Sequence, residues 1–335
     1  MGDLIEYTPR LHELAYTFGG VTPVLEVKPG TALRIFTEDC FGGAVRGVAD
    51  LPSQVCRFPY LNPVSGPFYV TGAEPGDTLA LHLASIAPAR DVGWSSTFPH
   101  FGALTSTHAT ATLQPPLDER VWRYPIDLDA GTVRYTARTS DYAVDLPLEP
   151  MLGTVGVAPA ASEARATVVP DVHGGNMDTP ELRSGVTPYL GVNVEGALFA
   201  LGDGHARQGD GEASGVAVET AMYTVLIVDL IKGLPPTPMP RIESDTAISS
   251  VGSSRPLEDA YRMSQADLVA WVGDLTGLDV LDAYQLVAQA GRALVANVCD
   301  PNYTMLAQLP KPYLRGADAY GGAHSRLRVI AAAHY

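Results

Sequence analysis

The chain has 335 residues, and its formal net charge of −15 argues against nucleic acid and anionic membranes as partners, because an acidic surface repels polyanions. Its hydrophobic content of 46% is enough for a large buried core, and we expect one compact unit over residues 1–335. No apolar run approaches the length of about 20 residues that a membrane-spanning helix needs.

Residues 1 to about 250 have the pattern of strands and turns. Leucines alternate with smaller or polar side chains over 79–83, which predicts a strand with one buried face. Residues 133–137 alternate in the same way. The segment Met222–Ile231 is rich in β-branched residues and predicts a strand buried on both faces.

The spacing of apolar residues becomes helical after a proline-rich segment. It predicts one helix over 256–275 and a second over 280–298, which we expect to pack antiparallel against the β core. Residues 299–335 then form a C-terminal tail. The predicted fold is therefore mainly β, with a large β-sandwich-type core over about 1–250 and a C-terminal antiparallel helix pair over about 256–298.

Acidic, imidazole and amide side chains are concentrated in one glycine-rich stretch, between Asp171 and Glu219. Glycine permits positive φ and lets a backbone approach a ligand closely. Polar side chains on such permissive loops are typical of a functional site. The sequence therefore predicts a site in this stretch.

A metal ion is the first chemistry that this stretch suggests. Asp203 and His205 are two residues apart, so on an extended segment both side chains lie on one face, with Cα atoms roughly 6.5 to 7 Å apart. Hydrolytic zinc sites combine His and carboxylate ligands with an open position for water. Asp178 is the preferred third ligand. The alternative is that these residues only form turns, since Asp commonly bonds its own backbone beside glycine.

Four further side chains are candidates for catalysis. Glu212 is the preferred general base, because amide hydrolysis must deprotonate water and protonate the departing nitrogen. Glu219, on a predicted strand, is expected to orient a metal ligand by hydrogen bonding. Asn176 and Gln208 are candidate donors to the developing oxyanion. For each of them, a solvated loop or simple turn structure is the alternative.

The same residues also carry a family resemblance. His173-Gly-Gly-Asn-Met-Asp178, Gly202-Asp-Gly-His205 and Gln208-Gly-Asp-Gly-Glu212 together resemble the core signature of the acetamidase/formamidase family. Asn62-Pro-Val-Ser-Gly-Pro-Phe-Tyr-Val-Thr-Gly-Ala-Glu-Pro-Gly-Asp77 and Gly153-Thr-Val-Gly-Val-Ala-Pro159 are similar to two more of its blocks, and Thr37-Glu-Asp39 is similar to a third. The resemblance implies hydrolysis of a short amide to a carboxylate and ammonia, on a β-rich and usually oligomeric scaffold. It also makes Asp39 a fourth candidate metal ligand.

Other designs for amide hydrolysis fit the sequence less well. Gly-x-Ser-x-Gly is absent, which argues against an α/β-hydrolase. A thiol nucleophile is conceivable at Cys40, but its sequence shows no adjacent histidine, so a buried inert cysteine is the preferred interpretation. The three cysteines form no metal or disulfide pattern and the N-terminal residues have no signal-peptide pattern, so we expect the cytoplasm.

These observations predict an amidohydrolase that cleaves formamide, acetamide or similar short aliphatic amides by attack of a metal-activated water. The expected cofactor is a divalent metal, with zinc preferred, and the expected assembly is a homo-oligomer. Two alternatives stay open: hydrolysis of a γ-lactam or other small cyclic amide, and a non-catalytic small-molecule-binding β-sandwich. Whether His173 or His100 enters the site is also left open.

Overall fold

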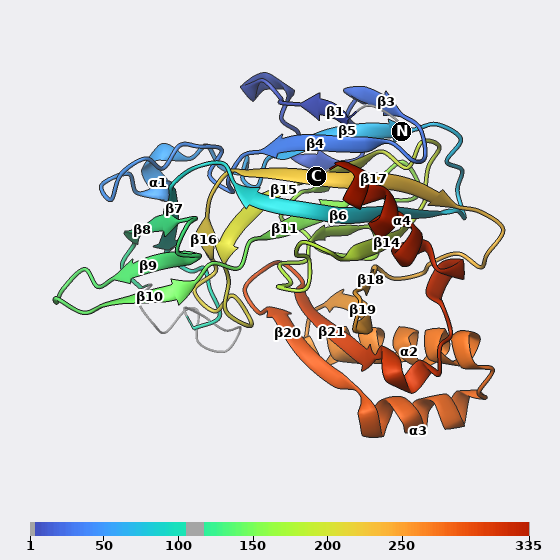
Figure 1. The fold of residues 1–335 in the computed structure, drawn as a ribbon. Helices are drawn as coiled ribbons and strands as arrows, with labels where there is room; N and C mark the ends of the chain where they lie inside the picture. Colours follow the sequence, from blue (N-terminus) through green and yellow to red (C-terminus); the bar gives the residue numbers. More distant parts are fainter. Residues whose placement is uncertain (1–3, 105–116, 335) are drawn as a thin grey trace.

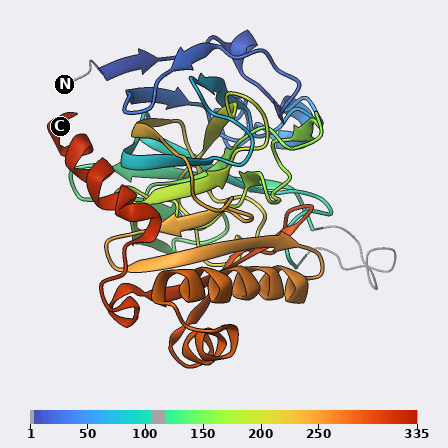
Figure 2. The ribbon, with the colours of Figure 1, turned by 90° about the vertical axis from the view of Figure 1, so that its right-hand side faces the viewer.

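Two large β-sheets pack face to face in the computed structural model, which describes residues 4–104 and 117–334 (Figure 1). Helices cover the outer face of the first sheet (Figures 1 and 2). The fold is mainly β with few helices, as the sequence predicts. None of the helices within the described ranges combines the length and the apolar character needed to cross a lipid bilayer.

Nine strands of the described residues form the first sheet. Their spatial order is β1 (Leu4–Tyr7), β4 (Ala32–Thr37), β17 (Met222–Ile231), β6 (Thr78–Pro88), β14 (Thr187–Gly191), β18 (Arg241–Glu243), β19 (Ala247–Ser254), β21 (Tyr303–Pro310) and β20 (Arg292–Asn297). The β1–β4 pair is parallel, and every other neighbouring pair is antiparallel. Residues from distant parts of the sequence are therefore neighbours in this sheet.

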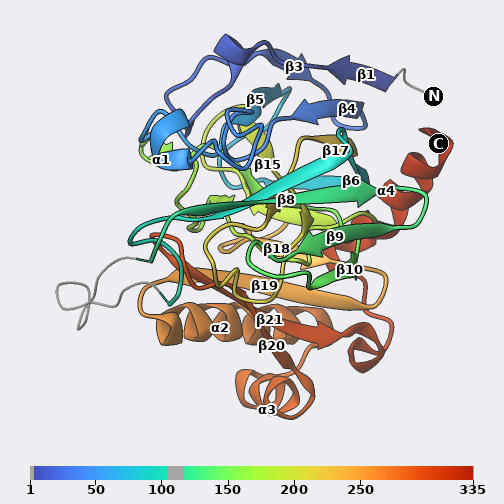
Figure 3. The ribbon, with the colours of Figure 1, turned by 90° about the vertical axis from the view of Figure 1, so that its left-hand side faces the viewer.

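The second sheet supplies half of the polar side chains predicted to act together, namely Asn176, Asp203, His205 and Glu219. Its main path is β10 (Ala143–Pro147), β9 (Thr132–Thr136), β8 (Arg120–Asp127), β7 (Val92–Thr97), β16 (Val218–Glu219), β15 (Phe199–Arg207), β11 (Met151–Gly156) and β13 (Gly174–Asn176). β5 (Val64–Val70) also pairs with β15, and β3 (Leu25–Val27) pairs with β5. Figure 3 shows β8, β9 and β10 from their outer side. A small sheet joins β2 (Thr17–Phe18) to β12 (Arg165–Ala166).

The largest hydrophobic cluster fills the space between the two sheets. Leu81 of β6 and Leu226 of β17 come from the first sheet, and Phe68 of β5 and Leu201 of β15 come from the second; all four are essentially fully buried. Burial of apolar surface on this scale is the main stabilising contribution to a fold of this size. The cluster therefore holds β15, and the polar residues on it, in a fixed position.

The strand predicted over 79–83 is present as part of β6, but both of its faces are covered at that end. Leu79, Leu81 and Leu83 face the core between the sheets, whereas Ala80 belongs to the cluster under the helices. His82, on this second face, is 1% exposed and packs against His324 of α4 (Ala323–Ala331). The expectation of a single buried face is therefore wrong here, because α4 covers the other one.

Two longer helices pack on the same sheet. α2 (Leu257–Thr276) lies against β19 and β21, and α3 (Val280–Ala290) lies against α2 and β21. The predicted pair is present, and its two axes are inclined to one another: Figure 2 shows α2 from the side and α3 end-on. The short elements are α1 (Pro52–Val55) and the 3₁₀ turns η1 (Leu11–Glu13), η2 (Lys311–Leu314), η3 (Ala319–Gly321) and η4 (Ala332–His334).

The second predicted helix ends earlier than the sequence pattern indicates. Helical structure stops at Ala290, Gly291 has extended backbone, and Arg292–Asn297 form the edge strand β20 beside β21. The prediction of a helix to residue 298 is therefore wrong for its last part. The predicted tail after residue 298 also contains regular structure, namely β21 and α4.

Candidate active site

Five carboxylates lie together beneath the second sheet's central strands, and none of them is more than 7% exposed. They belong to Asp178, Asp203, Glu212, Glu219 and Asp300. Burying an ionised carboxylate is costly unless it is paired, protonated or bound to a cation, and crowding like charges adds to the cost. Five buried carboxylates so close together therefore indicate that a positively charged group or ion binds among them.

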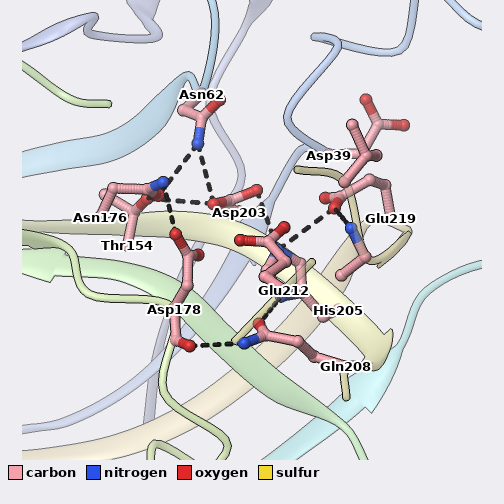
Figure 4. A network of polar contacts seen from close by, with 12 residues as sticks. Asp39, Asn62, Thr154, Asn176, Asp178, Asp203, His205, Gln208, Glu212 and Glu219 are labelled. Atoms are coloured by element: carbon pink, nitrogen blue, oxygen red, sulfur yellow. Dashed lines mark hydrogen bonds and ion pairs between the residues drawn. The ribbon is translucent and has the colours of Figure 1, made fainter. Parts of the chain in front are cut away.

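Strand β15 presents the first two of the predicted ligands. Asp203 and His205 project toward the site, and His205 Nε2 lies 3.3 Å from Asp203 Oδ1 (Figure 4). The glycines on either side of Asp203 in the sequence face the other way: a Cβ at Gly204 would overlap Met222, and one at Gly202 would crowd Pro63. These glycines let β15 pack closely on the core while its polar side chains face the site.

Gln208 fixes the orientation of His205. The Gln208 side-chain amide donates to the carbonyl oxygens of Asp178 (2.5 Å) and Ala296 (3.0 Å), which turns its Oε1 toward His205 Nδ1 at 2.9 Å. His205 Nδ1 therefore carries a proton, and Nε2 is directed at Asp203 and at Glu219 Oε1, 3.3 Å away. A histidine that binds a metal ion through one nitrogen usually donates its other N–H in this way.

Asn176 links two carboxylates from distant parts of the chain. Its side-chain amide donates to Asp178 Oδ2 at 2.6 Å and to Asp300 Oδ2 at 2.7 Å, and its Oδ1 accepts from Asn62 at 2.9 Å and from Thr154. Both N–H groups of Asn176 are thus already donated, as are those of Gln208. The geometry makes both amides positioning residues, and it offers no free donor from either for an oxyanion.

Three of the carboxylates stand on strained backbone. Asp178, Asp203 and Glu212 have φ of 45°, 60° and 44°, a left-handed region that side chains other than glycine rarely adopt. Such a conformation costs on the order of 1–3 kcal/mol, and it persists where the surrounding structure enforces it, frequently at functional sites. The strain aims these three side chains into one small space.

The residues present fit a metal ion. Asp178, His205 and Glu212 offer ligand atoms that all lie within 4.8 Å of one another, and so do Cys40, Asp203 and Glu219. Asp178 Oδ1 and Glu219 Oε2 are buried with no hydrogen-bond partner among the described residues. Behind them, a methyl group at Gly153 would overlap the carboxylates of Asp178 and Asp203. Carboxylate oxygens without partners beside an imidazole nitrogen form the donor set that a divalent cation such as zinc prefers.

Burial and mutual repulsion change the acidity of these groups. Burial, and then the charge of Asp178, raise the pKa of Glu212 well above its usual value. Burial raises the pKa of Glu219 to about 7. Burial alone would lower the pKa of His205, but the charges of Glu219 and Asp203 outweigh it and raise that pKa well above its usual value. A bound cation favours the ionised carboxylates and so lowers their pKa values again.

A pocket of about 400 Å³ opens onto this cluster. Asn176, Asp203, Glu212, Glu219 and Asp300 line one end of it, and the remaining lining residues are mostly apolar. No Lys or Arg is among its lining residues, all of which belong to the described part of the chain. A mostly apolar pocket with a few convergent polar groups is the usual form of a small-molecule site.

The model of the Acetamidase/Formamidase family matches this chain over residues 17–162 and 139–310. This chain belongs to the acetamidase/formamidase family. The resemblance of the sequence motifs is thereby confirmed, and every block that carries it lies inside the matched residues.

Curated relatives and solved structures agree with this membership. The chain is 27% identical to an acetamidase of Mycolicibacterium smegmatis over 261 residues, which is 62% of this chain and 63% of the relative. It is also 27% identical to a formamidase of Methylophilus methylotrophus over 252 residues, 62% of this chain and 61% of the relative. The chain thus aligns with about three fifths of the length of these relatives.

Crystal structures cover more of the chain. An acetamidase from Yersinia enterocolitica is 40% identical, with a TM-score of 0.85 over 93% of each chain. An acetamidase from Bacillus halodurans is 28% identical, with a TM-score of 0.83 over 94% of this chain and 100% of that one. A γ-lactamase from Delftia acidovorans, 20% identical with a TM-score of 0.60, is similar in fold alone.

Asp39, which the family resemblance suggested as a fourth ligand, is held by other partners. Its Oδ1 accepts from the backbone N–H groups of Phe41 (3.0 Å) and Gly43 (2.9 Å), and its Oδ2 lies 3.1 Å from Arg90. Neither of the two possible ligand groups includes it. Its place in the family block fits a role in shaping the loop that leads to Cys40 and Phe41.

Neither of the two histidines left open lines the pocket. His173 is 1% exposed, packs edge-on against Phe18 and has no hydrogen-bond partner for either ring nitrogen among the described residues. His100 is exposed, although its neighbours Pro99 and Phe101 both line the pocket.

Sequence reasoning missed three members of the site: Asn62, Thr154 and Asp300. Asn62 donates to Asp203 Oδ2 at 2.9 Å, and Thr154 donates to the same oxygen at 3.2 Å. Asn62 is the first residue of the family block 62–77, and Thr154 is the second residue of the block 153–159. Their membership in these blocks could therefore have marked both as site residues. Asp300 had no such signal, because its segment gave no pattern beyond the end of a supposed helix.

Proposed function

We propose that this chain hydrolyses uncharged primary amides, with formamide and acetamide as the simplest substrates, to a carboxylate and ammonia with the aid of a divalent cation. The observation that carries the proposal is the buried group of Asp178, His205 and Glu212 at the end of a pocket whose described lining residues include no Lys or Arg. The names of the similar proteins, acetamidase and formamidase, support the same chemistry.

Asp178, Asp203 and His205 would hold the cation, with zinc as the preferred ion. When bound, such an ion supplies a Lewis acid that polarises an amide carbonyl and makes water more acidic. The protein's part is to hold the ligands in place: Asn176 fixes Asp178, Asn62 and Thr154 fix Asp203, and Gln208 fixes His205. Glu219, 3.3 Å from His205 Nε2, further restrains the imidazole.

Glu212 is the group that would move the proton. It lines the pocket, and burial raises the pKa of its side chain above that of an ordinary glutamate. A carboxyl group of this kind takes a proton from the attacking water and gives it to the departing nitrogen. Cys299 Sγ lies 3.5 Å from Glu212 Oε2 and is the donor nearest to that oxygen in the hydrogen-bond network.

The charge of the pocket supports a neutral substrate. Asp203, Glu212, Glu219 and Asp300 line it, and no basic side chain lines it within the described part of the chain. An anionic acyl group would be repelled by these carboxylates and would find no positive side chain to pair with. Formamide and acetamide carry no charge, so they enter without this penalty.

Ammonia release tests the proposal. The purified full chain, loaded with zinc and verified by elemental analysis, is incubated with formamide, acetamide, propionamide and a γ-lactam. We expect ammonia from the linear amides, loss of activity after chelation and recovery when zinc is restored. Absence of ammonia from every amide with metal present overturns the proposed hydrolysis, and full activity in verified metal-free protein overturns the role of the cation.

We further propose a cytoplasmic homo-oligomer. All three cysteines are free in the structure, which fits a reducing compartment. On α3, Val280, Leu281 and Tyr284 are 68%, 71% and 58% exposed, an apolar surface of the kind that protein partners cover. Sedimentation analysis of the purified chain would give the number of subunits.

A further inference from the structure

The pocket is much larger than a formamide or acetamide molecule needs. Its volume of about 400 Å³ falls within the range of about 300–1,000 Å³ that is usual for sites enclosing drug-sized ligands. Formamide has no carbon beyond the carbonyl, and acetamide adds a single methyl group. Most of the pocket would therefore stay without contact to either substrate.

The surplus space is bounded by an aromatic wall, made of Phe41, Phe58, Phe98 and Phe101. Phe98 is at its centre, with ring centroids 6.4 Å from Phe41, 6.1 Å from Phe58 and 6.0 Å from Phe101. The contacts with Phe58 and Phe101 are edge-to-face. Aromatic rings favour this arrangement and the offset stack, so a further ring has faces and edges to pack against.

The aromatic wall runs from the carboxylates to the pocket's mouth. Phe41 follows Cys40, whose Sγ lies within 4.8 Å of ligand oxygens of Asp203 and Glu219. Phe41 and Phe98 are 5% and 8% exposed, whereas Phe58 is 51% exposed. A molecule with its amide at the carboxylates would thus direct its acyl group along Phe41 and Phe98 toward Phe58.

The other lining residues on this path are also apolar, including Leu61, Val168 and Val216. Apolar contact favours an apolar acyl group in proportion to the surface that it removes from water. Among the described residues that line the pocket none is basic and able to attract an anionic group, and the carboxylates repel one.

We propose that, within the amide hydrolysis on which this inference rests, the preferred substrates are primary amides whose acyl group carries an aryl ring, seated against the aromatic wall. The reaction is ordinary hydrolysis. The carbon–nitrogen bond of the amide breaks, a carbon–oxygen bond to water forms, and the nitrogen leaves as ammonia with a proton from that water. No oxidant, reductant or second substrate is needed.

The zinc-loaded full chain is assayed for ammonia from phenylacetamide and from acetamide. One extra methylene in an apolar pocket is worth about 10- to 200-fold in specificity, so we expect kcat/KM for phenylacetamide to exceed that for acetamide at least about tenfold. Acetamide cleaved as well as phenylacetamide, or better, overturns the aryl preference and leaves the proposed hydrolysis standing. Cleavage of neither overturns both.

Variants locate the preference in the aromatic wall. Phe98→Ala and Phe58→Ala should each lower the ratio of kcat/KM for phenylacetamide to that for acetamide, by about tenfold or more for Phe98→Ala. Phe58 is half exposed, so its variant keeps the test decisive if Phe98→Ala does not fold. The matched control is Phe36→Ala, whose ring packs against Tyr223 outside the pocket and should leave the ratio unchanged. An unchanged ratio in the folded wall variants overturns the inference.

Discussion

Glu212 combines three features that a solvated loop carboxylate lacks. It is 7% exposed, its backbone has a φ of 44°, and burial raises the pKa of its side chain well above the usual value. The loop is fixed from outside: Gly211 exchanges backbone hydrogen bonds with Val295 (3.1 Å) and Val298 (2.9 Å) at the end of β20. The alternative of a free surface glutamate is therefore inconsistent with the structure.

Glu212→Gln should remove the proton transfer while keeping the side chain's shape. We expect kcat for acetamide to fall by about 10²–10⁴, the range usual for a general acid or base, with KM and metal content close to those of the unchanged protein. Steady-state ammonia release and elemental analysis measure these quantities. The control is Asp210→Asn, which neutralises an exposed carboxylate two residues away and should keep full activity.

Glu212 also belongs to one of the two groups of possible metal ligands, so the variant separates two roles. Loss of the metal from Glu212→Gln would make Glu212 a ligand rather than a base. A variant that holds its metal and turns over within about threefold of the unchanged protein would remove Glu212 from the mechanism altogether.

The spacing of Asp203 and His205 predicted a shared face correctly, because an i, i+2 pair on a strand needs no long-range information. Asp300 could not be found in this way. It reaches Asn176 across 124 positions of sequence, and the packing of the β20–β21 connection brings the two together. Likewise, Asn176 and Gln208 were predicted as donors from residue type, but Asp300, Ala296 and the Asp178 carbonyl, which accept from them, are distant in sequence.

At the scale of elements, the region after Ala290 shows why local patterns have limits. Leu294 and Val295 fit the helical spacing that begins at Val280, and they fit a short strand equally well. The structure resolves this ambiguity with Gly291, which ends α3, and with the free edge of β21, which pairs with Arg292–Asn297. That edge is formed by residues later in the chain, so a window around Leu294 contains no information about it.

α4 is attached to the first sheet by a chain of buried polar groups. Thr187 of β14 lies 2.9 Å from His82 Nδ1 and 2.9 Å from His324 Nδ1, and His324 Nε2 lies 3.1 Å from Asp245. Arg328 of α4 pairs with the same aspartate. Burial, and then the nearby His324, lower the pKa of His82 to about 4, with Arg328 acting in the same direction and Asp245 against it. The folded protein thus holds His82 neutral.

This network should make the protein sensitive to acid. His82 has a pKa of about 4 in the folded protein and about 6.5 in the unfolded chain. Its contribution to the free energy of unfolding is therefore fully present above pH 6.5 and is lost as the pH falls toward 4. The loss amounts to about 3 kcal/mol at most. In this pH window the unfolded chain binds nearly one proton more than the folded protein because of His82. We therefore expect His82→Gln to reduce the slope of the unfolding free energy against pH by about 1.4 kcal/mol per pH unit.

Urea unfolding of both proteins at several pH values between 4 and 7, at one protein concentration, measures the slope. His173, whose pKa burial also lowers to about 4, provides a comparison, because His173→Gln should reduce the slope by a similar amount without touching α4. Equal slopes for the unchanged protein and His82→Gln would mean that His82 already carries its proton in the fold.

At the scale of the whole molecule, both sheets and the C-terminal segments converge on the five carboxylates and the polar side chains that hold them. β11, β13, β15 and β16 of the second sheet and the β20–β21 connection of the first each contribute a side chain to this group. Repulsion among the crowded carboxylates destabilises the folded state. A cation that binds only the folded protein offsets this repulsion and stabilises the fold. Metal binding should therefore stabilise the entire fold.

Zinc at a concentration of about 100 times its Kd should stabilise the folded protein by about 2.7 kcal/mol, and thus raise Tm by a few degrees above that of the chelated protein. Asp203→Asn removes one charge from the cluster, so it should lose most of this shift. Its metal-free form should melt no lower than the metal-free unchanged protein, because repulsion is relieved at the same time. Asp210→Asn, outside the cluster, should keep the full shift. Calorimetry with and without zinc measures all three proteins, and an undiminished shift in Asp203→Asn would show that the stabilising ion binds somewhere else.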